Sequence, residues 1–384
     1  MKAPKPILLL TNMKADDPTA EGIFEALGRA YREAGHPVLA AGQSNPFLAS
    51  RPLVERRSWG ELHRLGGSSN YLSARSRRTF RALVGLLGRS RAVHFHFGCT
   101  WNPAAALLRA LERRPIPCVA SFHDWANPSL RAPARLQKRG LRPLLRRCRR
   151  VTAVSSQTAR LLAADFPEIA GRLRVVPHGL RPERIRARNK PPESSAAPYA
   201  LCAARQASYK GTDILLTAWK DAAQGGAKAR LILCGPDETG GHFQRYARLL
   251  GIADQVDFAG VVSRERYWRL VDGSLFCVLA SRHEAFGLSA LEAMSRGKAV
   301  VATRSGGPES FVENGVSGLL VPPGDVNALR GAMERLMRDG GLRRRLGRAA
   351  RAQASRFRAA AAARSYLRLL ALPSRARRFT GGVS

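Results

Sequence analysis

The chain has 384 residues, of which 45% are hydrophobic and 24% are charged. These proportions are typical of a soluble globular protein, and they exclude a disordered chain, a collagen-like chain and a disulfide scaffold. The length suggests two domains, each large enough to bury its own core. The net charge of +36, from 64 basic and 28 acidic residues, is unusual. Either it reflects Arg-rich coding bias, or it attracts a polyanion such as an acidic membrane, a phosphorylated substrate or nucleic acid.

Short apolar runs alternate with helical patterns in the first half of the chain, which predicts a parallel sheet covered by helices on both faces. A helix is expected over Glu21–Ala34. The expected strands are Ile7–Leu10, Val38–Ala41, Ala92–Phe97, Pro117–Phe122, Val151–Val154 and Leu173–Val176. Residues 184–198 are polar, Pro-rich and aperiodic, and we interpret them as a linker.

The same alternation starts again after the linker. Strands are expected at Tyr199–Ala203, Ala229–Cys234, Val256–Phe258, Leu275–Leu279, Ala299–Ala302 and Gly318–Val321. Helices are expected at Thr212–Ala222, Arg264–Val271, Leu288–Arg296, Ala328–Met337 and Leu342–Phe357. We therefore predict two doubly wound α/β domains, residues 1–183 and 199–357. Ligands of such sheets bind beyond the carboxyl ends of the strands, and the cleft between two such domains is the expected site.

The six cysteines show no metal-binding spacing, because none forms a C-x-x-C pair and no nearby His completes a zinc motif. Most of them lie in apolar runs, as free thiols do in a reducing cytoplasm. The N-terminal apolar run is only four residues long, too short for a secretory signal. The sequence contains no apolar stretch of 18 residues, so no membrane span is predicted. We expect a cytoplasmic protein whose membrane contact, if it has one, is peripheral.

The loop between the expected strand Leu275–Leu279 and the expected helix Leu288–Arg296 carries the strongest functional signal. A helix N-terminus favours phosphate through its backbone N–H groups and its dipole. Here those groups belong to Phe286, Gly287, Leu288 and Ser289. Glu284 precedes the helix, and Glu292 lies about one turn into it, so both carboxylates could bind hydroxyls of one ligand. Two Glu at this spacing also occur by chance in many proteins.

The wider segment Ala280–Gly324 resembles the donor-binding motif of retaining glycosyltransferases of family 4, which have the GT-B fold. The matching pieces are E-A-F-G-L-S-A-L-E at Glu284–Glu292, G-G-P-E at Gly306–Glu309 and G-V-S-G-L-L-V-P-P-G-D at Gly315–Asp325. The resemblance implies two Rossmann-like domains that face each other across a cleft. It also implies that residues 358–384, a C-terminal helix and tail, return to the first domain.

The resemblance extends to three further segments. Arg205 and Lys210 follow the expected strand Tyr199–Ala203 and match the family's basic pair, although alone they would read as solvated loop charges. His123, in S-F-H-D, matches the family's active-site histidine, whereas a lone His at a strand end is more often structural. His178, in V-V-P-H-G-L, stands where the family usually has Asn.

By this resemblance, the donor is a nucleotide-diphosphate sugar, and the product keeps the anomeric configuration. The diphosphate would lie on the helix N-terminus with Arg205 and Lys210, without a metal or other cofactor. Glu292 would bind the ribose, Glu284 the sugar hydroxyls near the reacting carbon, and His123 the sugar from the first domain. A retaining hydrolase needs two carboxylates flanking that carbon. Only one is expected here, so front-face transfer is favoured.

The acceptor is less defined than the donor. We expect a hydroxyl group on a lipid-linked sugar or oligosaccharide, in cell-surface polysaccharide, lipopolysaccharide or glycolipid assembly. A soluble small-molecule acceptor is the alternative. Many relatives carry a Gly-Gly turn after the first strand, but here the loop is the longer, polar Thr11–Gly22. Lys14, Asp16 and Asp17 in this loop are either acceptor contacts or ordinary solvated residues.

The basic segment Arg131–Arg150 holds nine basic residues in twenty. Its apolar residues fall at helical spacing, and they are Leu141, Leu144, Leu145 and Cys148. Such a helix either lies on an anionic membrane at the inner face or packs its apolar stripe on its own domain.

Three rival functions follow from the same sequence. The high charge would suit a nucleic-acid-binding protein, but aromatic residues total only 7%, and no recognised basic–aromatic module is present. A sugar phosphorylase or a nucleotide-sugar hydrolase would share the GT-B fold. Phosphorylases of this fold usually depend on pyridoxal phosphate, and no lysine context for it is clear.

Overall fold

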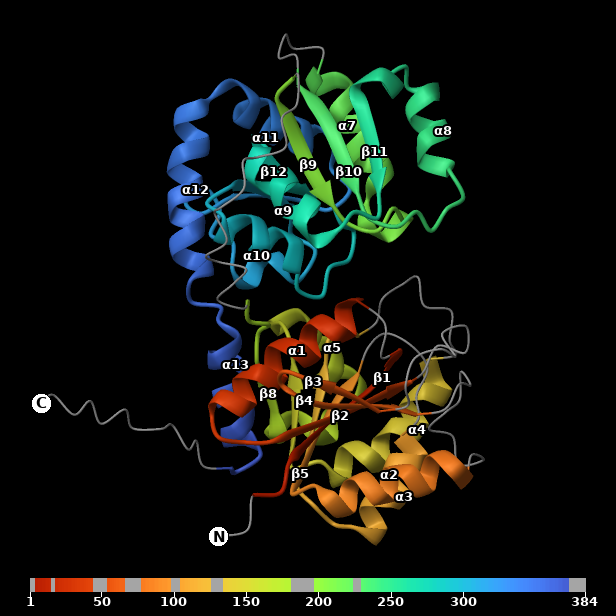
Figure 1. Ribbon diagram of the computed structural model, residues 1–384. Helices are drawn as coiled ribbons and strands as arrows, with labels where there is room; N and C mark the ends of the chain where they lie inside the picture. The colour runs from red at the N-terminus through yellow and green to blue at the C-terminus, as the bar shows by residue number, and fades with distance from the viewer. Residues whose placement is uncertain are drawn as a thin grey trace, which may run out of the picture. The chain divides into compact units, whose positions relative to one another are not determined.

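The computed structural model describes residues 4–14, 18–43, 54–65, 77–97, 104–125, 134–180, 197–223 and 229–372. The chain divides into two compact units. Unit 1 comprises residues 1–181 and 358–384, and unit 2 comprises residues 182–357. Each unit contains one sheet with helices on both faces (Figure 1). The predicted fold class, two Rossmann-like α/β domains, is therefore confirmed.

Unit 1 is built on an eight-stranded sheet in the order β3-β4-β2-β1-β5-β6-β7-β8. All neighbours are parallel except β3 and β4. The strands are β1 (Ile7–Lys14), β2 (Val38–Gln43), β3 (Val54–Arg57), β4 (Gly60–Leu65), β5 (Ala92–Phe97), β6 (Cys118–Phe122), β7 (Arg150–Ala153) and β8 (Leu173–Val175). In β1, Leu8 and Leu10 join one core cluster, while Ile7 and Leu9 join another. The stretch Ile7–Leu10 of β1 is buried on both faces and is apolar at every position, as the sequence predicted.

The helices of unit 1 include one from the far end of the chain. They are α1 (Pro18–Glu33), α2 (Arg77–Arg89), α3 (Ala104–Arg113), α4 (Ala134–Arg147), α5 (Ser156–Asp165) and α13 (Ala359–Leu369). Helix α13, drawn in blue, lies beside the red α1 (Figure 1), and its Tyr366 and Leu367 are buried. The chain crosses itself closely here, because a Cβ on Gly179 would overlap the backbone of Arg358.

Unit 2 is built on a six-stranded parallel sheet in the order β11-β10-β9-β12-β13-β14. Its strands are β9 (Tyr199–Ala203), β10 (Arg230–Cys234), β11 (Val256–Gly260), β12 (Phe276–Leu279), β13 (Ala299–Thr303) and β14 (Leu319–Val321). Its helices are α7 (Thr212–Ala223), α8 (His242–Leu249), α9 (Arg264–Gly273), α10 (Leu288–Ser295), α11 (Val326–Arg338) and α12 (Gly340–Ala354).

Both sheets reverse their strand order once, which creates a crevice at the carboxyl ends of the strands. In unit 2 the chain runs outward from β9 to β11 and then returns to β12, on the other side of β9. In unit 1 the reversal lies between β1 and β5. Loops that follow β9 and β12 in unit 2, or β1 and β5 in unit 1, are therefore the expected ligand sites.

The apolar stripe of α4 packs on its own unit. Leu141 is 2% exposed, Leu144 and Leu145 are fully buried, and all three belong to the main core cluster of unit 1. Arg146 and Arg147 face outward and are exposed. Of the two interpretations of this helix, packing of the apolar stripe on its own domain is the one that the buried side chains support. No helix in the described part of the chain is long and apolar enough to cross a bilayer.

The cysteines that the structure describes, Cys118, Cys148, Cys202, Cys234 and Cys277, are buried free thiols. Burial raises the pKa of the Cys202 thiol to about 12. Protonated, buried thiols are unreactive, so these side chains serve as small hydrophobic groups.

Candidate functional site

The loops that follow β9 and β12 are bonded to each other at the reversal point of unit 2. The backbone N–H groups of Arg282 and His283 donate to the Tyr209 carbonyl oxygen, at 2.9 and 3.3 Å. The Arg282 guanidinium donates to both carboxylate oxygens of Asp213, at 2.7 and 2.6 Å. Burial raises the pKa of Asp213, but the bonds from Arg282 outweigh this and hold it below its ordinary value. This fork-like pair, which the sequence analysis missed, fixes one loop against the other.

The structure brings together two of the predicted site residues, Lys210 and Glu284. Lys210 Nζ donates to Glu284 Oε2 at 2.7 Å, and the two side chains are only 17% and 12% exposed. Ser281 Oγ donates to the same carboxylate oxygen at 3.3 Å. Lys210 follows β9 and Glu284 follows β12, so this pair forms only because the two strands are neighbours in the sheet. A cation and a carboxylate thus share one partly buried point at the crevice.

The segment before α10 is held by the loop that follows β13. The Glu284 backbone N–H donates to the Ser305 carbonyl oxygen at 3.1 Å, and the Gly307 N–H donates back to the Glu284 carbonyl oxygen at 2.7 Å. A Cβ on Gly307 would overlap the backbone of Phe286. The G-G-P-E motif therefore brings one loop backbone against another, and Glu309 accepts from the Gly306 N–H at 3.0 Å.

Helix α10 begins at Leu288, directly after Gly287. Gly287 has φ +96°, a left-handed conformation that favours glycine, and it offers no side-chain cap. The first N–H groups of an α-helix have no carbonyl partner within the helix. The N–H groups of Leu288 and Ser289 therefore stand at a positive helix terminus, beside the loop that carries Glu284.

Glu292 lies on α10 and is 9% exposed. The Tyr267 hydroxyl donates to Glu292 Oε2 at 2.8 Å. Burial raises the pKa of Tyr267 well above its ordinary value, and the nearby carboxylate adds to this effect. Tyr267, on α9, is a site residue that the sequence analysis missed.

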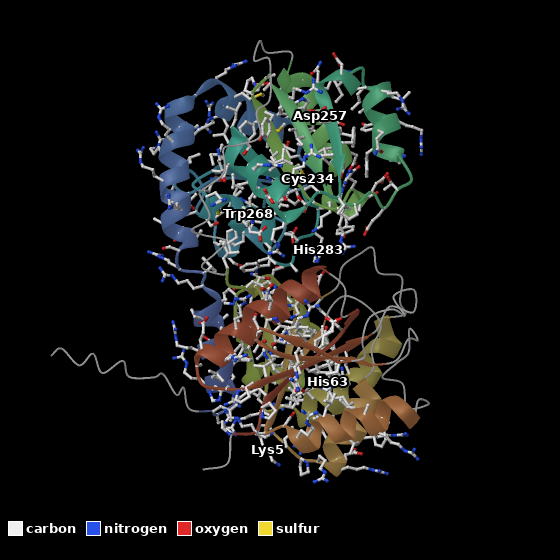
Figure 2. All side chains as sticks on the ribbon, in the orientation of Figure 1. Lys5, His63, Cys234, Asp257, Trp268 and His283 are labelled. Atoms are coloured by element: carbon white, nitrogen blue, oxygen red, sulfur yellow. The ribbon has the colours of Figure 1, made fainter. Side chains whose placement is uncertain are left out.

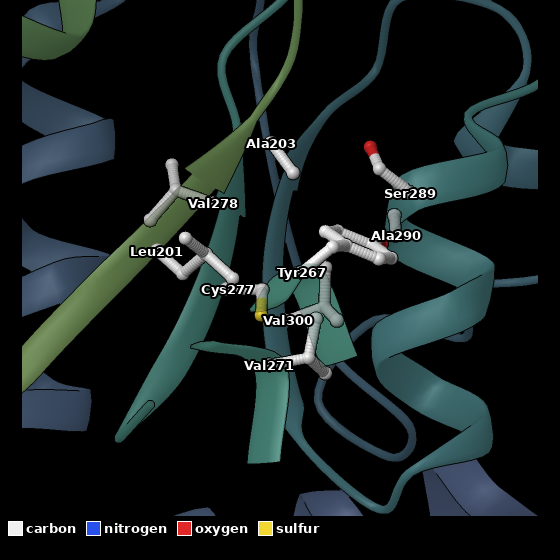
Figure 3. Close-up of a pocket in the computed structure, with 9 residues that line it drawn as sticks. All are labelled: Leu201, Ala203, Tyr267, Val271, Cys277, Val278, Ser289, Ala290 and Val300. Atoms are coloured by element: carbon white, nitrogen blue, oxygen red, sulfur yellow. The ribbon is translucent and has the colours of Figure 1, made fainter. Parts of the chain in front are cut away.

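A small cavity lies beneath the start of α10. Figure 3 shows the Tyr267 ring beside Ser289 and Ala290 of this helix, with Cys277 on the same cavity. Its volume is about 10 Å³, room for roughly one water molecule. The cavity is far too small for a nucleoside.

Arg205 has a different partner from Lys210. Its guanidinium donates to Glu238 Oε1 at 2.7 Å, and the two side chains are 45% and 39% exposed. Glu238 lies on the loop that follows β10. The basic pair of the sequence therefore follows β9 as predicted, but each cation is paired with a different acid. Figure 2 labels His283 at this same end of the strands.

His123 belongs to unit 1 and directly follows β6. Its ring stacks between those of His96 and His178, with centroids 5.0 and 4.9 Å away. Its Nε2 lies 2.7 Å from His96 Nδ1, and its Nδ1 lies 3.3 Å from His178 Nε2. Both ring nitrogens of His123 are therefore engaged by other histidines. The side chains of Lys14, Asp16 and Asp17 lie outside the residues that the structure describes.

The two halves of the chain match two family models. Residues 183–353 match the family "Glycosyl transferases group 1", and residues 20–184 match "Glycosyltransferase Family 4". A glycosyltransferase from Rickettsia africae has a similar fold over 95% of this chain and 98% of its own, with a TM-score of 0.76 at 18% identity. Anabaena Alr3699/HepE, in complex with UDP and glucose, gives a TM-score of 0.75 at 20% identity, over 95% of this chain and 99% of its own.

Curated relatives are similar over shorter stretches. A D-inositol 3-phosphate glycosyltransferase from Acidothermus cellulolyticus is 34% identical over 52% of this chain and 48% of its own length. The lipopolysaccharide core biosynthesis glycosyltransferase LpsE from Rhizobium meliloti is 36% identical over 37% of this chain and 41% of its own. The matches thus span less than half the length of these two relatives. In sequence and in fold, the chain is therefore similar to GT-B glycosyltransferases of the group 1 and family 4 type.

Proposed function

We propose that this protein is a retaining glycosyltransferase that transfers a sugar from a nucleotide-diphosphate donor to a hydroxyl acceptor. The observation that carries the proposal is the Lys210–Glu284 pair at the strand-order reversal of unit 2, beside the uncapped start of α10. Lys210 and the start of α10 can bind negative charge, and Glu284 can bind hydroxyl groups. A sugar nucleotide carries both a diphosphate and hydroxyl groups.

The diphosphate of the donor lies on the N–H groups of Leu288 and Ser289, with Lys210 and Arg205 as the neighbouring cations. These groups stabilise the charge that develops on the leaving diphosphate, and they are in place before the reaction. Arg205 and Lys210 supply the positive charge that stabilises the leaving diphosphate, so we propose no metal ion and no other cofactor. Their present partners, Glu284 and Glu238, keep both cations oriented while no donor is bound.

Glu284 binds hydroxyl groups of the transferred sugar near the reacting carbon. Lys210 and Ser281 contact only one of its carboxylate oxygens, Oε2. Glu292 binds the ribose, oriented by the Tyr267 hydroxyl. With one carboxylate at the reacting carbon, the departing phosphate takes the acceptor's proton on the same face, and the configuration is retained.

The histidine site of unit 1, at His123, contributes polar contacts to the sugar. The acceptor is a hydroxyl of a lipid-linked sugar or oligosaccharide in surface glycoconjugate assembly, with a soluble small molecule as the alternative. The named functions of the relatives support both, because one acts in lipopolysaccharide core biosynthesis and another on inositol phosphate.

The excess charge would hold the protein at the inner face of an anionic membrane. Since the α4 stripe is buried, this attraction is purely electrostatic and should weaken steeply with salt. Co-sedimentation with vesicles of anionic or neutral lipid, at low and high salt, tests it. Equal binding to both lipids, or binding that salt leaves unchanged, contradicts the membrane proposal.

The central experiment combines binding and turnover. A thermal-shift screen over nucleotide sugars identifies the donor, because a ligand that binds the native state raises the melting temperature. Glu284→Gln should then lower kcat by at least about a hundredfold, the effect expected of a group acting in the transition state, while nucleotide affinity stays within a few-fold.

Lys210→Met should instead weaken nucleotide binding, and Lys220→Met, a change on α7, serves as the matched control. Unchanged turnover in Glu284→Gln would remove this residue from the mechanism. Sugar release at the same rate with and without acceptor would indicate a hydrolase rather than a transferase.

A further inference from the structure

Three phenylalanine rings of unit 2 form a closed cluster beside the start of α10. Phe286 lies just before this helix, Phe311 follows the G-G-P-E motif, and Phe357 comes shortly after the end of α12. The ring centroids of Phe286 and Phe311 are 5.3 Å apart, and Phe357 lies 6.2 and 6.0 Å from these two rings. Both pairs that include Phe357 are edge-to-face, an attractive arrangement of aromatic rings. We call these residues the phenylalanine cluster.

The packing of Phe286 determines how the chain enters α10. Its side chain is buried, and a Cβ on Gly307 would lie only 2.3 Å from its Cα atom, so its backbone is in close contact with the loop that follows β13. The next residue, Gly287, forms the N-cap without a side-chain hydrogen bond. Glycine adopts many backbone conformations. The direction of the first turn is therefore set by the packing of its neighbours and not by Gly287 itself.

Helix α12 runs along α10 in the opposite direction. The two helices lie side by side (Figure 1). A Cβ on Gly347 would lie 2.2 Å from the Gly297 carbonyl oxygen, so α12 contacts the chain just beyond the C-terminal end of α10. Phe357 contacts the other end of α10, through Phe286. The eight residues of α10 span about 12 Å and the fifteen of α12 about 22 Å, so α12 is long enough to support both ends.

Phe357 is held by α12 independently of α10. Its backbone N–H donates to the Ala354 carbonyl oxygen at 3.0 Å, which extends the last turn of the helix. The buried side chains of α12 include Leu342, Leu346, Ala350 and Ala354. These residues keep α12 on the core, whereas the Phe357 side chain is partly exposed. Loss of the Phe357 ring should therefore leave α12 in place and loosen the start of α10.

We propose that Phe357 is a positioning residue for the donor diphosphate. Through Phe286 it holds the first turn of α10 in the orientation in which the N–H groups of Leu288 and Ser289 bind phosphate oxygens. Phe357 itself does not contact the substrate. Donors that are oriented before the ligand arrives lose less freedom on binding, so their orientation strengthens affinity. This inference rests on the proposed function for its ligand, and it adds a residue from outside the donor-binding segment.

The first test examines the start of α10 without any ligand. The Leu291 N–H donates to the Gly287 carbonyl oxygen at 3.1 Å and closes the first turn. In Phe357→Ala, hydrogen exchange of peptides that cover α10 should be faster by about tenfold, as measured by mass spectrometry. Phe258→Ala, on β11, is the matched control, because Phe258 is also partly exposed and packs on the core of unit 2. Unchanged exchange in Phe357→Ala, or equal acceleration in both variants, would overturn the proposal whether or not the protein transfers sugar.

The second test separates positioning from a direct role in the reaction. UDP, GDP and ADP are titrated calorimetrically into the native protein, and the nucleotide that binds most tightly is used for the variants. Phe357→Ala should weaken its binding by about tenfold and raise the donor KM by a similar factor, while kcat stays within about threefold of native. Phe258→Ala should bind nucleotide as the native protein does. Native affinity in Phe357→Ala, or a fall in kcat alone, would contradict the positioning role.

A milder variant keeps the proposal testable if Phe357→Ala fails to fold, which far-ultraviolet circular dichroism would show. Phe357→Leu retains most of the apolar contact, so its exchange and its nucleotide affinity should change by only about threefold, with Phe258→Leu as its control. Native behaviour of Phe357→Leu in both measurements, together with an unfolded Ala variant, would assign Phe357 to stability and refute positioning. A native protein that binds none of the three nucleotides would refute the proposed function, while the exchange rates would still decide whether Phe357 holds the start of α10.

Discussion

Acidification should destabilise unit 1 long before it affects unit 2. Burial lowers the pKa values of His94, His96 and His123 well below 6.5, and that of His178 to about 4. Between the folded and unfolded pKa values, the unfolded chain binds more protons than the native one, so falling pH favours unfolding. The stability is therefore fully present above pH 6.5 and is lost progressively below it.

The loss can be estimated from these shifts. One pKa unit corresponds to about 1.4 kcal/mol, so His178 alone, shifted from 6.5 to about 4, removes about 3 kcal/mol at pH 4. At pH 5.5, one unit below the unfolded value, His178 removes about 1.4 kcal/mol, and the buried His94, His96 and His123 add to this loss, against a typical domain stability of about 5–15 kcal/mol. In unit 2, Arg230 holds the pKa of Asp257 below its ordinary value, and this stability is lost only below about pH 4.

Hydrogen exchange read by mass spectrometry distinguishes the units, because peptides from β5 and β12 report on unit 1 and unit 2 separately. After correction for the intrinsic pH dependence of exchange, the opening free energy of β5 should fall by more than about 1.4 kcal/mol between pH 7.5 and pH 5.5, while that of β12 stays nearly constant. His178→Asn should reduce the fall by about 1.4 kcal/mol, and His63→Gln controls for the loss of a histidine. Equal slopes in both units, or an unchanged slope in His178→Asn, would refute the reasoning.

Three further predictions concern unit 2. Gly307→Ala should push its loop away from Phe286, destabilise unit 2 by about 1–3 kcal/mol and abolish the thermal shift with nucleotide, as seen by calorimetry. Gly331→Ala, whose added Cβ meets nothing within 4 Å, is the control and should leave the shift intact. Tyr267→Phe leaves Glu292 without its buried donor and should weaken nucleotide binding by roughly tenfold in calorimetric titrations, and equal affinity would separate Tyr267 from the site. EDTA should leave kcat/KM unchanged, and a loss that Mg²⁺ restores would show that charge stabilisation needs a metal.

The centres of both sheets were predictable from the sequence, whereas the edge of unit 1 was not. Strands such as β9 and β12 are apolar without interruption because helices cover both of their faces. The edge strands β3 and β4 read V-E-R-R and G-E-L-H-R-L, where polar residues hide the strand pattern. The expected helix over Leu342–Phe357 is shorter at its C-terminal end than predicted. In the structure α12 ends at Ala354, and α13 begins at Ala359.

The identity of the site residues was easier to predict than their partners. Glu284 and Lys210 were found from motif and position, but their ion pair joins residues 74 apart and depends on β9 and β12 being neighbours. Tyr267 carried no signal, because a Tyr in a helical pattern is ordinarily a core residue. The stack of His96, His123 and His178 was not predictable either, although His123 and His178 were singled out individually. Its members lie on three separate segments that meet only where the sheet brings their ends together.

The arrangement of charges separates the site from the excess of basic residues. At the unit 2 crevice, Lys210, Arg205 and Arg282 each pair with a carboxylate, so these groups add little to the net charge of +36. The excess instead lies on outer helix faces, as on α12, where Arg344 and Arg348 are exposed and nitrogen-tipped side chains project outward (Figure 2). Exposed charges act mainly through a long-range field that salt screens. Donor binding should therefore depend only weakly on ionic strength, while any attraction to a polyanion should depend on it strongly. Measuring both at several salt concentrations would show whether the same surface binds the donor and the polyanion.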